Sequence, residues 1–281
     1  MSGSKGAEAL FREELLRELE TDCGNCRGLC CTVLCFSRSE GFPVDKEAGV
    51  PCVFLQPDFR CGVHAELKER GLRGCMAYDC LGTGRKVTHA VSGAAPPGNA
   101  APEPGLMCGL FGVVFQLHQM LWYLAEADEL TAPGTRRDEI RTLIGENRRV
   151  TDLPPEELIT LDMGEYRHRV NSILKETWET AARETAGKFR KSRGFEYIGR
   201  DFRGQDLRGR DFGGALLIAA DFRCCDLCGV NFLGADLRDA RLEDANLSAS
   251  VFLTPMQLSS ARGNRGTALP ARLSAPGMWL E

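Results

Sequence analysis

Cysteines are the residues of this chain with the clearest capacity for chemistry. There are 13 in 281 residues, and nine of them lie between Cys23 and Cys80. The Cys23-x-x-Cys26 turn can present two thiolates to one metal ion, at about 2.3 Å from each sulfur. A second half-site further along the chain would complete a tetrahedron. Because reduced thiols are normal in a chain without an export signal, the cluster favours metal binding over disulfides.

The number of cysteines exceeds the need of one ion. A tetrahedral zinc site takes four thiolates, so the surplus leaves room for two ions, a polynuclear site or an iron–sulfur cluster. Adjacent Cys30 and Cys31 do not easily reach one ion, so one of them serves a second ion or stays free. We favour zinc, because such half-sites without an electron-transfer partner are more often structural; iron is the alternative. His64 is either a further ligand or an ordinary helix residue.

The spacing of these cysteines resembles that of a bacterial family of zinc- or iron-chelating Cys-rich domains. The matching motifs are CxxC, CC, PCxxL, RCxxH and two later cysteines, all within residues 23–80. Carried over by position, the resemblance implies metal ligands at Cys23, Cys26, Cys30, Cys31, Cys52, Cys61, Cys75 and Cys80. The chain departs from the family where three residues, and not two, separate Cys26 from Cys30. Cys35 has no counterpart and stays outside this ligand set.

A second pattern occupies residues 197–252, where a large apolar residue recurs at every fifth position. The centres are Tyr197, Phe202, Leu207, Phe212, Leu217, Phe222, Leu227, Phe232, Leu237, Leu242, Leu247 and Phe252. Neither an α-helix nor a flat strand keeps this period on one face. The residue two positions before the centre is small from the fifth unit on. The residue just before it is mostly Asp or Asn, which readily hydrogen-bonds turn backbone.

This A-(D/N)-(L/F)-x-x pattern resembles the pentapeptide-repeat family. The resemblance implies a right-handed quadrilateral parallel β-helix with four pentapeptides per turn, hence three coils. Arg200, Gln205 and Arg210 stand where small residues belong, so we expect the opening coil to be splayed or partly uncovered. The same register places Cys225 inward and leaves Cys224 and Cys228 outside. We assign no chemical role to these three cysteines or to Cys108.

The expected fold class is therefore α+β and multidomain, with a Cys-rich and helical front followed by the β-helix. The predicted parts are a Cys-rich metal-binding domain at 1–90, a flexible loop at 91–107, a helical region at 108–190, the repeat coil at 195–254, and a C-terminal cap and tail at 255–281. An apolar stripe predicts a helix at 7–20, and we expect a strongly apolar helix at about 108–130 and another at about 134–147. Asp152, followed by Pro154-Pro155 and two acids, indicates the start of a further helix, which continues to about Ala186 with a break at Gly164. This order of parts resembles that of certain actinobacterial proteins.

Charge and composition argue against several classes of function. The formal net charge of −4 is too balanced to indicate nucleic-acid or membrane binding. We find no signal-peptide pattern and no run that approaches 18 apolar residues, so we expect a cytoplasmic protein without membrane contact. The Gly-x-Gly at Gly82 and Gly84 lacks the preceding strand of a phosphate-binding loop.

The leading interpretation is a cytoplasmic zinc-binding or iron-binding protein whose repeat coil contacts a partner protein. One alternative is an iron or iron–sulfur redox metalloenzyme. Another is a DNA-mimic protein that protects a topoisomerase. Against this alternative, seven arginines interrupt the negative charge of the ten acids within residues 195–253. The sequence contains no nucleophile triad or paired carboxylates, so catalysis stays an open question, as does the oligomeric state.

Overall fold

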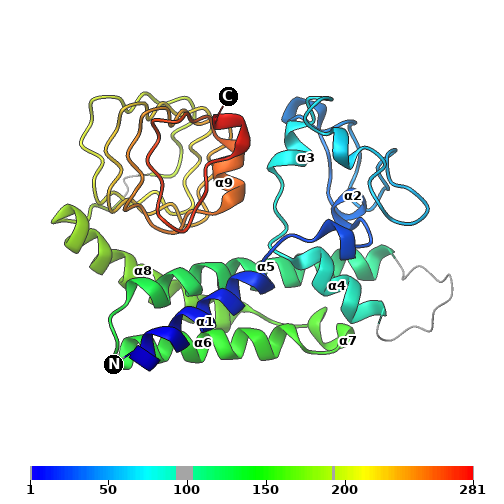
Figure 1. The fold of residues 1–281 in the computed structure, drawn as a ribbon, viewed down its shortest axis with the longest axis horizontal. Helices are drawn as coiled ribbons and strands as arrows, with labels where there is room; N and C mark the ends of the chain where they lie inside the picture. The colour runs from blue at the N-terminus through cyan, green and yellow to red at the C-terminus, as the bar shows by residue number, and fades with distance from the viewer. Residues whose placement is uncertain (1, 93–103, 192–193, 281) are drawn as a thin grey trace. The chain divides into compact units, whose positions relative to one another are not determined.

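The computed structural model describes residues 2–92, 104–191 and 194–280, which form two compact units (Figure 1). The first unit comprises Met1–Ala125 and Pro133–Val170, and the second comprises Glu126–Ala132 and Asn171–Glu281. Most of the flexible loop expected at 91–107 lies outside the described residues.

Helices build most of the first unit. The long ones are α1 (Ser2–Glu18), α4 (Thr83–Ser92), α5 (Pro104–Leu130), α6 (Thr135–Thr151) and α8 (Gly164–Ala186), and the short ones are η1 (Cys23–Asn25), α2 (Leu29–Val33), η2 (Arg38–Glu40), η3 (His64–Glu66), α3 (Arg73–Ala77) and α7 (Pro155–Leu158). Helices α5 and α8 end in the second unit. The four predicted helices are confirmed, except that the last is divided into α7 and α8 by residues 159–163, directly before Gly164. Helix α4 was not predicted.

Helix α5 forms the core of the helical part, since Leu117, Leu121 and Leu124 are almost completely buried. Polar side chains on its neighbours satisfy main-chain groups in this core. For example, Asn147 Nδ2 donates to the Leu117 carbonyl at 3.0 Å. By length and composition alone, α5 could cross a membrane, contrary to the expectation that no run was apolar enough. Half of the relevant stretch is buried within the protein, however, as in a core helix.

The repeats of the second unit bury the residues that their period selects. The eleven centres from Phe202 to Phe252 are at most 1% exposed, and the small residues two positions earlier, from Ala215 to Ser250, are at most 4% exposed. Large and small side chains alternate in the interior, as a narrow core requires. The rings of Phe202 and Phe222 stack with centroids 4.8 Å apart. The predicted inward positions are confirmed, including that of Cys225.

The Asp and Asn residues before the centres bind turn backbone, as predicted. Each accepts a hydrogen bond on its side-chain oxygen from the backbone N–H two residues later, over distances of 2.9–3.3 Å. The residues that do so are Asp201, Asp206, Asp211, Asp221, Asp226, Asn231, Asp236 and Asn246. These short acceptors satisfy donors that no neighbouring layer reaches.

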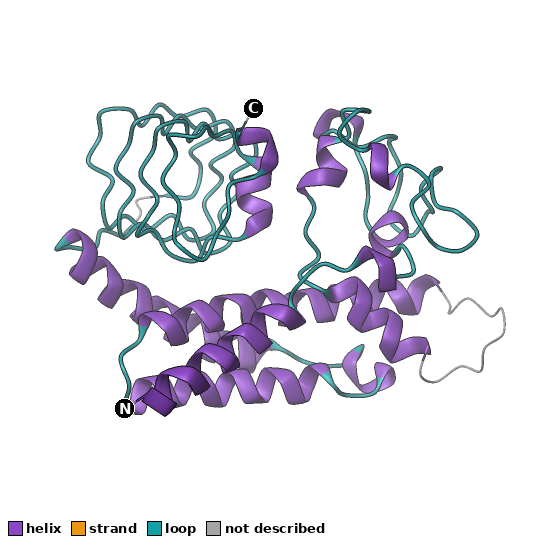
Figure 2. Ribbon diagram, viewed as in Figure 1, coloured by secondary structure: helices purple, strands orange, loops and turns teal. Residues whose placement is uncertain are grey.

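The expected fold class, α+β with a right-handed quadrilateral parallel β-helix, is wrong. Figure 2 shows helices and loops but no strand in the described part of the chain, which is mostly helical. In the described repeats, backbone pairing of the β type is limited to isolated parallel bridges, such as those between Glu196 and Leu216 and between Asp201 and Asp221. In the five-residue unit a two-residue turn separates successive bridging residues. Neighbouring residues therefore never pair in the continuous ladder that defines a strand.

The first repeats carry long polar side chains where small residues are missing. Arg200 and Gln205 are exposed, but the centres Tyr197, Phe202 and Leu207 are buried, so the expectation of a splayed or partly uncovered opening coil is wrong. The Arg200 guanidinium lies 5.4 Å from the centroid of the Tyr197 ring, and that of Arg210 lies 5.1 Å from the centroid of the Phe212 ring. These cation–π contacts cover aromatic rings that no alanine shields.

The C-terminal segment contacts the last repeats. Isolated bridges join Arg241 to Arg262 and Asn246 to Ala268. Beyond the short helices α9 (Pro255–Ser260) and η4 (Gly277–Trp279), the buried Trp279 donates its indole N–H to the Ala261 carbonyl at 3.1 Å. The end of the repeat interior is thus lined by this segment.

Candidate functional site

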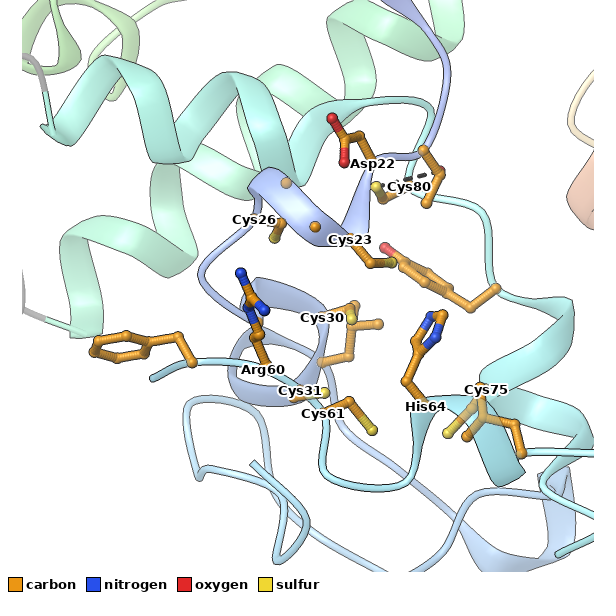
Figure 3. A pocket seen from close by; sticks show the side chains of 18 of the residues that line it. Asp22, Cys23, Cys26, Cys30, Cys31, Arg60, Cys61, His64, Cys75 and Cys80 are labelled. Carbon is orange, nitrogen blue, oxygen red and sulfur yellow. Dashed lines mark hydrogen bonds between the residues drawn. The ribbon is translucent and has the colours of Figure 1, made fainter. Parts of the chain in front are cut away.

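A cavity of about 370 Å³ in the first unit gathers most of the predicted ligand cysteines. Seven of the eight line it, namely Cys23, Cys26, Cys30, Cys31, Cys61, Cys75 and Cys80. Figure 3 shows these side chains around one space, with His64 and Arg60 beside them. Aromatic residues complete the wall. Segments almost sixty residues apart in the chain therefore bring their thiols to one place.

The first cysteines are held by tight local turns. Asp22 caps η1 by accepting hydrogen bonds from the backbone N–H of Asn25 at 3.2 Å and from its side-chain amide at 2.7 Å. Gly28, just before α2, adopts a φ of +61°. A Cβ on Gly28 would lie 2.4 Å from Leu55 Cδ1 and 2.7 Å from the Phe59 carbonyl oxygen, so only glycine fits there. Helix α2 then carries Cys30 and Cys31.

The middle cysteines are joined to α2 by main-chain contacts. The Cys52 N–H donates to the Cys31 carbonyl at 2.8 Å. An isolated antiparallel bridge joins Leu55 to Cys61 and returns the chain toward the same region. Cys52 is buried and is not part of the cavity wall, the one predicted ligand for which this is so.

The last cysteines are placed by α3 and by the start of α4. Cys75 lies within α3, and Cys80 lies three residues before α4. Thr21 Oγ1 donates to Asp79 Oδ1 at 2.5 Å and lies 3.4 Å from Cys80 Sγ. A Cβ on Gly84 would lie 2.6 Å from Cys26 Sγ and 3.8 Å from Cys80 Sγ. Gly84 therefore leaves room for two sulfurs, which explains a glycine that matched no phosphate-binding loop.

Burial and mutual proximity disfavour free thiolates in this cavity. Burial, aided by neighbouring thiols, raises the pKa of Cys23 to about 11 and that of Cys75 to about 12. The pair at α2 differs, because a hydrogen bond between the two thiols raises the pKa of Cys30 and lowers that of Cys31 to about 7. A cation in the cavity would reverse the raised values, since metal coordination deprotonates thiols.

The thiols do not form a closed coordination shell. Across the described ranges, no group of three or more His, Cys, Asp or Glu side chains is arranged to hold a metal ion. The sulfurs would have to converge for an ion to be bound. Two observations fit such a ligand. The donor set is rich in soft thiols, and the buried Tyr78 hydroxyl on the cavity wall has no hydrogen-bond partner in the structure.

The other candidates named from the sequence are distributed more widely. His64 is exposed yet lines the cavity, whereas Cys35 is exposed and lies outside it. In the second unit, Cys224 is exposed and Cys225 is buried, with its Sγ donating to the Phe202 carbonyl at 3.4 Å. Cys228 Sγ accepts from the Asn246 amide at 3.3 Å. The thiols of Cys225 and Cys228 therefore serve local hydrogen bonding.

Sequence reasoning missed several residues of the cavity wall. Thr21, Arg60, Tyr78 and Gly84 all belong to it. Asp22, directly before a turn, carried a readable capping signal. Gly84 carried none, because its closeness to two sulfurs depends on where α4 meets η1.

The comparisons with known proteins concern the repeats and the whole chain. The family model for pentapeptide repeats matches eight copies at residues 201–232 and 211–252, which confirms that resemblance. The "Uncharacterized protein YybG" of Bacillus subtilis (strain 168) is 40% identical over 276 residues, covering 97% of this chain and 99% of that protein. No solved structure matches.

These comparisons correct part of the expected family assignment. The relative comes from Bacillus, and nothing in the matches supports the actinobacterial grouping or the resemblance to a Cys-rich chelating domain. The similarity to YybG extends along nearly the full length of both proteins, repeats included. The chain therefore belongs to the same family as YybG, and it is a pentapeptide-repeat protein.

Proposed function

We propose that this chain is a cytoplasmic metal-binding protein, with zinc held by the Cys-rich part and a partner protein bound by the repeats. The observation that carries the proposal is the meeting of seven thiols at one cavity. Iron is the alternative metal. All thirteen cysteines lie in the described residues and are unbridged, as suits a reducing compartment.

The interior of the Cys-rich part supports a folding role for the metal. Between residues 23 and 80, the buried apolar side chains are those of Leu29, Phe36, Cys52, Val63 and Cys80. So small a core supplies little hydrophobic stabilisation. A structural zinc ion supplies about 10–16 kcal/mol of binding free energy, which becomes folding free energy when the site forms only in the folded chain.

The exterior of the repeats supports a protein partner. Arginines follow turn aspartates by two residues and pair with them, as in Arg203–Asp201 at 2.7 Å and Arg238–Asp236 at 2.7 Å. Positive and negative charges therefore alternate over short distances on the surface of the repeats. A DNA mimic needs a continuous negative surface, so these pairs argue against topoisomerase protection.

Metal analysis of the full chain, purified without oxygen, tests the proposal. We expect bound zinc and a colourless solution, and we expect Cys35→Ser, outside the cavity, to retain the metal. Bound iron together with absorption in the visible range would show that iron and not zinc is the metal, and a redox role would again be a candidate. A wild-type chain without metal, whose circular dichroism is unchanged by added zinc or by a chelator, would overturn the proposal.

A further inference from the structure

We infer that the eight cysteines form two separate four-sulfur groups, each for one ion, and that the chain passes from one group to the other between Cys30 and Cys31. The first group is Cys23, Cys26, Cys30 and Cys80. The second group is Cys31, Cys52, Cys61 and Cys75. This inference rests on the proposed metal binding and adds the number of ions and the assignment of each ligand.

The first group is assembled where η1 meets the start of α4. The Cys26 and Cys80 sulfurs both approach the Cβ position of Gly84, at 2.6 and 3.8 Å. Cys23 shares the short turn of Cys26, and Thr21, two residues before Cys23, touches the Cys80 sulfur at 3.4 Å. We place Cys30 in this group because Figure 3 shows it above Cys31, on the side of Cys23. Its thiol interacts most strongly with that of the adjacent Cys31, and next with those of Cys26 and Cys23.

The second group is assembled on the other side of α2. The 2.8 Å hydrogen bond from the Cys52 N–H to the Cys31 carbonyl fixes two members, and the bridge at Leu55 brings in Cys61. Figure 3 shows Cys31 and Cys61 together in one part of the cavity, with Cys26 and Cys80 in another. The same figure shows Cys75, on α3, on the side of Cys61 and away from Cys26, and its thiol interacts electrostatically with those of Cys31, Cys52 and Cys61.

Helical geometry explains why adjacent cysteines belong to different groups. Successive residues of an α-helix project about 100° apart, so the side chains of Cys30 and Cys31 leave α2 in different directions. Their thiols nevertheless hydrogen-bond to each other. The two ions would thus be neighbours with separate ligand sets.

The charge near the two groups also differs. Lys46 Nζ donates to the carbonyls of Thr32 and Glu47, both at 3.3 Å, beside α2. Its ammonium interacts with the thiols of Cys52 and Cys31, which are second-group members, and also with those of Cys35 and Cys108. A four-thiolate zinc site carries excess negative charge, and Lys46 would offset it in the second group.

Zinc content of full-length variants tests the partition. We expect two zinc ions per wild-type chain, one in Cys80→Ser, one in Cys61→Ser and none in the double variant. Cys35→Ser is the control and should keep two. One ion in the wild type, or loss of all zinc from either single variant, would indicate one shared site and overturn the partition. Failure of the underlying proposal is a different result, namely no zinc in the wild type.

Gly84→Ala gives a test that keeps every thiol. Its added methyl group displaces the Cys26 sulfur, so we expect zinc affinity at the first group to fall by about 10-fold or more while the second group stays loaded. The matched control is Gly145→Ala in α6, where an added Cβ meets no atom within 4 Å. Competition with a chromophoric chelator measures both affinities. Unchanged affinity at both sites, or equal weakening of both, would overturn the assignment.

Discussion

The Cys-rich segment (23–80) and the repeats (195–253) are stabilised in opposite ways. The repeats bury an apolar side chain at every fifth residue and satisfy turn donors with Asp and Asn. The Cys-rich segment buries five apolar side chains in 58 residues and has thiols around a cavity. A repeated local rule suffices for the first kind of structure. The second kind depends on a few contacts between distant segments, and the proposed metal would strengthen them.

Removal of the metal should have the largest effect, and it should affect the two segments differently. We expect a strong chelator to unfold the Cys-rich segment, because the lost binding free energy is about 10–16 kcal/mol per structural zinc. The repeats, which contain no predicted ligand, should keep their structure. Hydrogen exchange followed by mass spectrometry would report each segment separately. Equal protection of the Cys-rich segment with and without chelator would contradict the contrast.

A substitution that creates a cavity in the repeat interior should destabilise the repeats and leave the Cys-rich segment unaffected. Phe222 is fully buried and stacks on Phe202, so Phe222→Ala should lower the free energy of unfolding of the second unit by about 3–5 kcal/mol. Zinc content should not change. Phe195→Ala is the matched control, since this side chain is 66% exposed and its loss should matter little. Chemical denaturation of each variant measures the difference, and similar losses in both would refute the assigned core.

Glu126 should make the stability of the second unit depend on pH. Its carboxylate is buried, accepts a hydrogen bond from the Phe252 N–H at 2.8 Å and pairs with Arg272 at 2.5 Å. Burial outweighs the arginine and raises the pKa of Glu126 from 4.5 to about 7. The folded state then binds the proton more tightly than the unfolded state. The stabilisation that protonated Glu126 gives the folded state is present below pH 4.5 and is lost as the pH rises through about 7.

Replacing the carboxyl isolates this contribution. We expect the free energy of unfolding to fall by about 1–3 kcal/mol between pH 4.5 and pH 8 in the wild type, and to lose most of this slope in Glu126→Gln. Glu184→Gln, at an exposed position of α8, should keep the slope. Urea unfolding at several pH values measures it. A slope that survives in Glu126→Gln would assign it to another group.

A single turn in the repeats should show the smallest effect. Asp236→Ala removes the acceptor of the Arg238 N–H, at 3.1 Å, and should lower the free energy of unfolding by about 1 kcal/mol. Asp236→Asn keeps an oxygen at the same place, as Asn231 does in its own turn, and should be nearly neutral. Thermal melting distinguishes the two. Equal losses would show that the paired Arg238 side chain matters more than the turn.

The sequence predicted best those features that depend on residues close together in the chain. The buried centres such as Phe222 and the turn acceptors such as Asp236 depend on residues within one pentapeptide, so their roles were readable. The assembly of the cysteines was predicted only from spacing and resemblance. The structure brings seven of them to a cavity wall but leaves Cys52 off it.

Other features depend on contacts that spacing does not encode. Gly84 meets Cys26 only after α4 is placed, and Glu126 meets Arg272 across 146 residues. The missing strands have a local cause that the resemblance obscured, because turns between single bridges leave no room for a ladder. Arg200 and Arg210 suggested an uncovered first coil, but both lie over aromatic rings, and the centres of that coil are buried.

The side-chain pairs between layers determine which insertions and deletions the repeats can tolerate. Asn231 Nδ2 donates to Asp211 Oδ1 at 2.8 Å, and Asn246 repeats this contact with Asp226 at 3.3 Å, each across twenty residues. Loss of one residue would turn the interior side chains outward. Loss of five would keep them inward but part each amide from its carboxylate. Gain or loss of twenty residues preserves both relations, so whole layers are the natural unit by which this part of the gene can lengthen or shorten.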